Sequence, residues 1–192
     1  CFLGGFTSFL FCSNSNALTI LKRVFLGSIM ASETTAAAGG AVGKLRFDPM
    51  AMLPFCGYNM ADYFAHWLSI GEKTSAKKLP QIFFVNWFRR DNDGRFLWPG
   101  YGENSRVLKW VFERITGKGA AQKTAIGYLP DTNSLDVTGL TVSKDDLSAL
   151  LTLDTAGWLE AVPQIREHFA NFGDRLPTKL KTSLDSLESA LA

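Results

Sequence analysis

The sequence predicts a mixed α/β fold whose C-terminal third is mostly helical. Three short runs around residues 20–29, 82–88 and 124–128 are rich in the branched and aromatic residues that buried strands prefer. From about residue 144 onward, the apolar residues recur at helical spacing instead. With 192 residues, the chain is long enough to form one domain with a substantial core.

Composition narrows the classes of function. Apolar residues make up 46% of the chain and charged residues 20%, which is typical of a globular protein. A net charge of +2 is too small to predict a nucleic-acid or membrane partner, which requires clustered basic residues. Three cysteines without C-x-x-C spacing predict no metal site and fit a reducing, cytoplasmic setting.

The N-terminal segment is unusual, because the chain opens at Cys1 and its first methionine is Met30. We therefore expect a truncated or spliced product. Its opening run CFLGGFTSFLF is shorter than the ~20 apolar residues that span a bilayer, and no basic region precedes it. A buried strand or a remnant of truncation is the favoured interpretation, with an interfacial or targeting segment as the alternative.

The next elements are expected as follows. Residues 20–29 should form a strand, and the small, glycine-bearing segment 32–44 a mobile surface loop. Residues 45–55 should be extended, punctuated by two prolines. Asn59 is positioned to cap a helix over residues 60–69, with one apolar face. This face consists of Tyr63, Phe64, Trp67 and Leu68.

The middle of the chain predicts a strand, a turn and a helix. The run QIFFVNWF at 81–88 is strongly β-prone, and RRDNDG at 89–94 is a turn cluster. Residues 96–98 resume extended chain, and a helix should start at Asn104 or Ser105 and stop at Gly117. Its expected apolar face consists of Val107, Leu108, Val111, Phe112 and Ile115.

The last third should follow a short strand at 124–128. Ser143 and Asp146 have the spacing of a capping box before a helix over residues 144–153. A helix from about Thr155 should kink or break at Pro163. The final helix should bury a stripe of Leu180, Leu184, Leu187 and Leu191.

Two motif matches fail. GGAVGKL is no phosphate loop, because Ala38 stands where its first glycine belongs and Leu45 follows the lysine instead of Ser or Thr. RRDNDG is no calcium loop, because the alignment puts Arg89 at the first ligand position and Gly100 at the place of the bidentate glutamate. Neither stretch predicts an ion or phosphate site by itself.

The segment FLWPGYGENSR at 96–106 has a composition suited to a purine. Phe88, Phe96 and Tyr101 offer flat apolar faces for stacking. Guanine differs from adenine in its O6 acceptor and its N1 and N2 donors, so an amide such as that of Asn104 could select it. Glycines at 100 and 102 would let the backbone approach the ring closely. From the residues alone, an aromatic core around a turn and helix remains the alternative.

Four stretches together resemble a known family. PFCGYN at 54–59, AHWLS at 65–69, VNWFRRDNDGRFLWPGYGENSRVL at 85–108 and IGYLP at 126–130 are similar, in order and spacing, to the C-terminal region of GTP-dependent phosphoenolpyruvate carboxykinases. The resemblance runs from about Val24 to residue 192 and leaves residues 1–23 unmatched. It implies an α/β fold, the mixed-sheet part of the C-terminal nucleotide-binding domain with a helical C-terminal third.

The resemblance also implies a site. Phe88, Phe96 and Tyr101 would enclose the guanine of GTP or GDP, and the stretch from Tyr101 through Gly102 and Glu103 to Asn104 would contact the nucleotide. Residues 32–44 would match the family's lid, which closes over the active site and excludes water. The lid residues are Ser32, Glu33, Thr34, Thr35, Gly39, Gly40, Gly43 and Lys44.

The family's reaction converts oxaloacetate and GTP to phosphoenolpyruvate, GDP and carbon dioxide in gluconeogenesis, with Mn²⁺ or Mg²⁺. It needs a phosphate loop, metal ligands and arginine clamps, and these motifs are missing from the sequence. Ala31 and Leu53 stand where the family usually has arginine, and the lid is neutral at Gly39, Gly40 and Ala41.

We therefore assign no catalytic residue and no metal ligand. His66 and His168 lack a catalytic partner at a recognisable spacing and are expected to be structural. The chain should be a fragment or a degenerate paralogue of the family that binds guanine nucleotide without turnover, and a scaffolding fragment is the alternative. Activity would require a longer product or a complementing chain.

Overall fold

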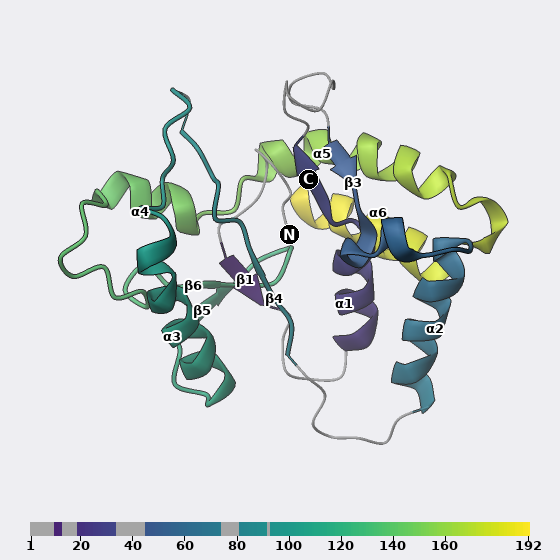
Figure 1. Ribbon diagram of the computed structural model, residues 1–192, viewed down its shortest axis with the longest axis horizontal. Coiled ribbons are helices and arrows are strands. Elements are labelled where there is room, and N and C mark those ends of the chain that lie inside the picture. The colour runs from purple at the N-terminus through teal and green to yellow at the C-terminus, as the bar shows by residue number, and fades with distance from the viewer. Residues whose placement is uncertain (1–9, 13–18, 34–44, 74–80, 92) are drawn as a thin grey trace.

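The computed structural model describes residues 10–12, 19–33, 45–73, 81–91 and 93–192. Figure 1 shows a small sheet with helices α3 and α4 to one side and α1, α2 and α6 to the other. The α/β class predicted from the sequence is confirmed. In chain order, the helices are α1 (Thr19–Ser28), α2 (Met60–Lys73), α3 (Asn104–Ile115), α4 (Lys144–Leu151), α5 (Thr155–Ala170) and α6 (Thr178–Leu191).

The main sheet has the strand order β4-β1-β6-β5, and β2 pairs with β3 in a separate ribbon. Every strand pair among the described residues is antiparallel, so the mixed sheet stays a prediction. Strand β1 lies centrally, with Phe11 opposite Phe84 and Cys12 opposite Tyr128. The strands are β1 (Leu10–Cys12), β2 (Ala31–Glu33), β3 (Leu45–Phe47), β4 (Phe83–Val85), β5 (Ala121–Lys123) and β6 (Tyr128–Pro130).

The strand predicted at 20–29 is wrong, because this segment forms helix α1. Residues 23–29 are all buried, and the short apolar run at 24–26 fits a buried helix as well as a buried strand. α1 packs closely on α2 at Gly71, where an added Cβ would lie 2.8 Å from the Cβ of Ile20. Tertiary packing therefore overrides the β-propensity of this run.

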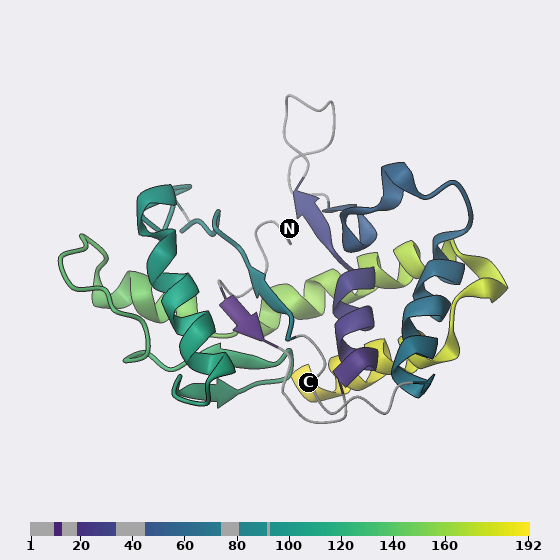
Figure 2. The ribbon, with the colours of Figure 1, turned by 60° about the horizontal axis from the view of Figure 1, so that its bottom comes forward.

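Helices α1, α2, α5 and α6 enclose the larger of two clusters of buried side chains, which we call the large core. Figure 2 shows α1 beside α2, with α5 and α6 running across them. The leucine stripe predicted on α6 is confirmed and fully buried. Asn59 caps α2 as predicted, since its Oδ1 accepts from the Ala61 N–H at 2.9 Å, although the helix continues to Lys73. Prominent members of the large core are Phe25, Phe64, Trp158, Ile165 and Leu184.

A second cluster lies between α3, α4 and the chain that follows β4, and we call it the small core. The predicted bounds of α3 and its stop at Gly117 are confirmed. The predicted apolar face is partly wrong, because α3 buries Val107 and Trp110 whereas Leu108, Phe112 and Ile115 are exposed. The buried members of the small core are Leu97, Trp98, Val107, Trp110, Leu135, Leu150 and Leu151.

The capping box of α4 is present as predicted. Ser143 Oγ accepts from the Asp146 N–H at 3.0 Å, and an Asp146 carboxylate oxygen accepts from the Ser143 N–H. A kink or break was predicted at Pro163, and the break is wrong, since α5 runs through Pro163 as one helix. Pro163 and Leu159, four residues earlier, are both exposed, so the carbonyl that loses its helical hydrogen bond lies on the solvent side.

Two predicted extended stretches also differ. Of the strand expected at 124–128, only Tyr128 is in a strand, as the first residue of β6. Residues 124–127 form the turn of the β5–β6 hairpin, where the Thr124 N–H donates to the Gly127 carbonyl at 2.7 Å and Gly127 has φ 153°. Of residues 45–55, only β3 is extended, and two 3₁₀ turns follow at Pro49–Ala51 and Leu53–Phe55. Their prolines stand in the first turn, where the missing N–H is not needed.

Candidate functional site

The chain between β4 and α3 carries the aromatic residues singled out in the sequence. β4 ends at Val85, and the buried side chain of the next residue, Asn86, accepts from the Phe88 N–H at 3.0 Å as the chain turns. An isolated bridge between Arg90 and Phe96 then closes the turn. Phe88 and Phe96 meet at its base, with ring centroids 5.9 Å apart and an interplanar angle of 66°.

This pair of rings lies open to solvent. The exposed fraction is 53% for Phe88 and 45% for Phe96. The guanidinium carbon of Arg90 lies 4.4 Å from the Phe96 ring centroid, so a cation borders the pair. An exposed aromatic pair of this kind can take a flat ligand with some negative charge.

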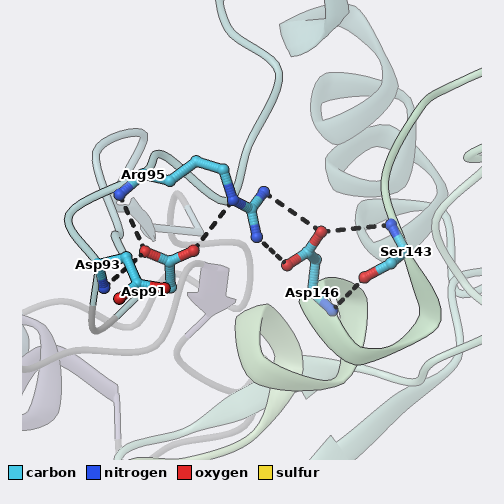
Figure 3. Close-up of polar contacts among 5 residues, drawn as sticks. All are labelled: Asp91, Asp93, Arg95, Ser143 and Asp146. Carbon is cyan, nitrogen blue, oxygen red and sulfur yellow. Dashed lines mark hydrogen bonds and ion pairs between the residues drawn. The ribbon is translucent and has the colours of Figure 1, made fainter.

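The turn that holds the pair is fastened by its own charged residues (Figure 3). Asp91 Oδ1 accepts from the N–H groups of Asp93 at 3.1 Å and Arg95 at 2.9 Å, and Gly94 takes a positive φ of 82°. The Arg95 guanidinium contacts Asp91 at 3.0 Å and Asp146 at 2.7 Å. The prediction of a turn here is confirmed, and the Asp91 carboxylate is engaged by Arg95 and by backbone N–H groups.

Asp146 links this turn to helix α4. The Asp146 carboxylate accepts hydrogen bonds from the Arg95 guanidinium and from the Ser143 backbone N–H. These contacts lower the pKa of Asp146, and the bond from Arg95 has the largest effect. The same bond raises the pKa of Arg95. The capping box and the aromatic turn are therefore one connected polar network, which fixes the turn against the small core.

The next segment turns at Gly100 and enters α3. Trp98 is buried with an exposed fraction of 2%, whereas Tyr101 is exposed at 93%. Gly100 has φ 115°, a conformation that strains any residue with a Cβ. The indole Nε1–H of Trp98 donates to Asn104 Oδ1 at 2.9 Å.

The remaining predicted contact residues lie on the same turn. Glu103 forms an ion pair with Arg106 at 2.7 Å, and Gly102 has open space where a Cβ would stand. Arg106 also donates to the carbonyls of Asp136 at 2.8 Å and Thr138 at 3.0 Å. Glu103 is thus engaged within the protein.

The structure places Phe88 and Phe96 together but not Tyr101 with them. No ring contact of Tyr101 occurs within the part of the chain that the structure describes. Two participants were not predicted from the sequence: Trp98 as the partner of Asn104, and Arg90 as the cation beside Phe96. No local pattern would have identified the first, because the contact depends on the turn at Gly100.

Similarity to known proteins identifies the family of this chain. The family model described as the phosphoenolpyruvate carboxykinase C-terminal P-loop domain matches residues 7–190. The phosphoenolpyruvate carboxykinase (GTP) of Neocallimastix frontalis is 59% identical over 169 residues. The chain belongs to the GTP-dependent phosphoenolpyruvate carboxykinase family.

Two bacterial carboxykinases of the same name agree with this. Those of Treponema pallidum and Paenarthrobacter aurescens are 53% and 49% identical over 170 and 168 residues. Each of the three alignments covers 88% of this chain and 28% of the relative, so the chain spans little more than a quarter of the carboxykinases it matches. The family model also takes in most of residues 1–23, beyond the resemblance noted from the motifs.

The carboxykinase lid expected at 32–44 is described only at its base. Ser32 and Glu33 belong to β2, opposite Arg46 and Leu45 of β3, so the loop prediction is wrong for these two residues because backbone pairing extends into them. The predicted lid residues Thr34, Thr35, Gly39, Gly40, Gly43 and Lys44 lie outside the described residues.

The two positions where a carboxykinase arginine was expected differ in setting. Ala31 is buried in β2, opposite Phe47, whereas Leu53 is exposed and its N–H donates to Asp48 Oδ1 at 3.1 Å.

A divalent metal ion requires several donor side chains that lie close together. No group of three His, Cys, Asp or Glu side chains suited to a metal ion occurs among the described residues. His168 is packed in the large core, stacked on Phe47 at 4.3 Å, with Nε2 donating to the Ser28 carbonyl at 3.0 Å, so its predicted structural role agrees with its position. None of the helices in the described part of the chain is long and apolar enough to cross a membrane.

Proposed function

We propose that this chain provides the guanine-binding surface of a GTP-dependent phosphoenolpyruvate carboxykinase. The observation that carries the proposal is the exposed Phe88–Phe96 pair, held on a turn that the ion pair from Arg95 to Asp146 fastens to α4. Stacking a base on an aromatic ring contributes about 1–3 kcal/mol. Burial of these rings by a purine would remove apolar surface that the free chain leaves in water.

Tyr101 completes this proposed surface. Its ring is almost fully exposed and stands one residue after Gly100, whose positive φ reverses the chain. A base stacked between Tyr101 and a phenylalanine would separate the two rings, which agrees with their lack of direct contact. Gly102 then leaves room for the base edge to approach the backbone near Asn104.

The complete enzyme would convert oxaloacetate and GTP to phosphoenolpyruvate, GDP and carbon dioxide, a gluconeogenic step. We assign this reaction to a longer polypeptide or to a complementing chain, and not to these residues alone. The described residues hold no metal-binding cluster, and the sequence has no phosphate-loop motif. Segment 32–44 would serve as the lid, carried on the β2–β3 ribbon.

Calorimetric titration of the chain with GDP and ADP tests the binding proposal. GDP should bind more tightly, and Phe88→Ala or Phe96→Ala should weaken GDP binding by roughly 1–3 kcal/mol through lost stacking. Phe112→Ala is the matched control, because it removes an exposed phenylalanine that lies on α3 and outside the aromatic turn. Equal affinities for GDP and ADP in the unaltered chain would refute the proposal.

A scaffolding module is the second candidate. One stripe of α3, formed by Leu108, Phe112 and Ile115, is exposed although apolar, which is typical of a contact surface. Size-exclusion chromatography of Phe112→Ser beside the unaltered chain tests it. A self-associating chain that becomes monomeric in the variant, combined with no nucleotide binding, would favour the scaffold.

A further inference from the structure

The orientation of the Asn104 amide is fixed by its partner. The indole nitrogen of Trp98 carries a hydrogen and can only donate, so the Asn104 atom 2.9 Å from it must be the carbonyl oxygen Oδ1. The usual ambiguity between the oxygen and nitrogen of an asparagine side chain is thereby removed. The Nδ2 amino group must point away from the indole.

Both partners are held on rigid parts of the fold. Trp98 is buried in the small core beside Val107 and Trp110 of α3. Its neighbour Leu97 is tied back by an N–H bond to the Arg89 carbonyl at 2.9 Å. Asn104 is the first residue of α3 and is half-buried. The bond therefore joins two elements whose positions are set by packing.

The geometry leaves the Asn104 amino group available as a hydrogen-bond donor. Within the described residues, the bond from Trp98 is the one hydrogen bond of the Asn104 side chain. A fixed donor matches the O6 acceptor of guanine, whereas adenine presents an amino group at that position. Two facing donors repel, so a fixed amide discriminates against adenine as well as favouring guanine.

We propose that Trp98 is a positioning residue that sets the purine preference of this site, because its indole N–H locks Asn104 with Nδ2 toward guanine O6. The inference rests on the proposed guanine site and adds to it the group that makes Asn104 selective. Without the indole donor, the amide could turn over and offer Oδ1 to the amino group of adenine. Selectivity then depends on a residue that does not touch the base.

Trp98→Phe tests this, because it keeps an aromatic ring in the core and removes the donor. Calorimetry with GDP, IDP and ADP should show weaker GDP binding by roughly 3- to 10-fold, the effect of one hydrogen bond. ADP binding should stay equal or improve, so the GDP/ADP ratio falls. IDP, which shares O6 with GDP but lacks the N2 amino group, should weaken in parallel with GDP.

The matched control is Trp110→Phe, which removes another buried indole donor from the same core. Trp110 Nε1 donates to the Ala120 carbonyl at 3.1 Å and makes no hydrogen bond with Asn104, so this variant should keep the GDP/ADP ratio. A ratio that falls equally in both variants would overturn the inference, as would a Trp98→Phe chain that keeps the preference. If the unaltered chain binds GDP and ADP equally well, the proposed function itself fails.

A second variant covers the case in which Trp98→Phe does not fold. Asn104→Asp keeps the acceptor for the Trp98 indole and replaces the Nδ2 donor by an oxygen. GDP and IDP should both bind more weakly, and the GDP/ADP ratio should fall. Weakened GDP binding with unchanged IDP binding would show that the side chain contacts N2 and not O6, which would contradict the inference.

Discussion

The two cores of this chain are held together in different ways. In the large core, helices meet through apolar stripes, and the indole nitrogen of Trp158 is buried without a hydrogen-bond partner within the described residues. In the small core, the indoles of Trp98 and Trp110 both donate, to Asn104 and to the Ala120 carbonyl. Apolar packing therefore dominates the large core, while directed polar bonds fix side chains in the region that borders the candidate site.

The largest expected effect comes from emptying the large core. Leu184→Ala removes a fully buried side chain of α6 and should lower the free energy of unfolding by about 2–5 kcal/mol. Phe112→Ala on α3 removes a larger side chain that is 68% exposed, and should change the free energy of unfolding by less than about 0.5 kcal/mol. Urea unfolding followed by circular dichroism measures both. Similar losses in the two variants would show that the α3 stripe is covered.

A paired tryptophan substitution isolates the polar bonds of the small core. Trp110→Phe and Trp158→Phe delete the same atoms from fully buried sites, but among the residues that the structure describes only Trp110 loses a hydrogen bond. The Ala120 carbonyl keeps a bond from Ser134 Oγ at 2.9 Å, so Trp110→Phe should cost only about 1 kcal/mol more than Trp158→Phe. The same urea titration checks this. An equal or larger loss for Trp158→Phe would contradict the comparison.

The sequence predicts best where the signal is local. The capping box at Ser143 and Asp146, the Asn59 cap and the leucine stripe of α6 each depend on residues within a few positions, and all three are present. The strand expected at 20–29 fails because its helical state depends on α2 and α6, which lie far away in sequence. Local signals fix caps and stripes, whereas the choice between a buried helix and a buried strand requires the tertiary contacts.

The same division holds in the candidate site. Its aromatic and glycine residues could be predicted from composition, and the contact of Phe88 with Phe96 follows from a short turn. The bond from Trp98 to Asn104 and the link from Arg95 to Asp146 could not, because each joins side chains across turns whose geometry the sequence does not specify.

The cap of α4 offers a smaller test of how the small core is fastened. Ser143→Ala removes the side chain that accepts from the Asp146 N–H, and should lower the free energy of unfolding by about 1 kcal/mol. Thr178→Ala is the control, because α6 is entered from Pro177 without a side-chain cap. Thermal unfolding followed by circular dichroism compares the two. Equal losses would show that the capping box adds nothing beyond helix propensity.

The smallest effect is a pH dependence that belongs to the large core. Burial lowers the pKa of His168 below its ordinary value of 6.5, and this effect outweighs the opposing bond to the Ser28 carbonyl. Below about pH 6.5, the unfolded chain takes up a proton that the folded chain does not, so stability should fall as pH drops from 6.5 toward the folded-state pKa. Nothing comparable is expected from the small core, whose buried members include no histidine.

His168→Gln removes this titration while leaving an amide that can still donate to the Ser28 carbonyl. Urea unfolding at several pH values between about 5.5 and 8 should show a shallower loss of stability on acidification than in the unaltered chain. If the loss of stability on acidification is as steep in His168→Gln as in the unaltered chain, the pH response does not arise from His168, and the large core is as insensitive to pH as the small one.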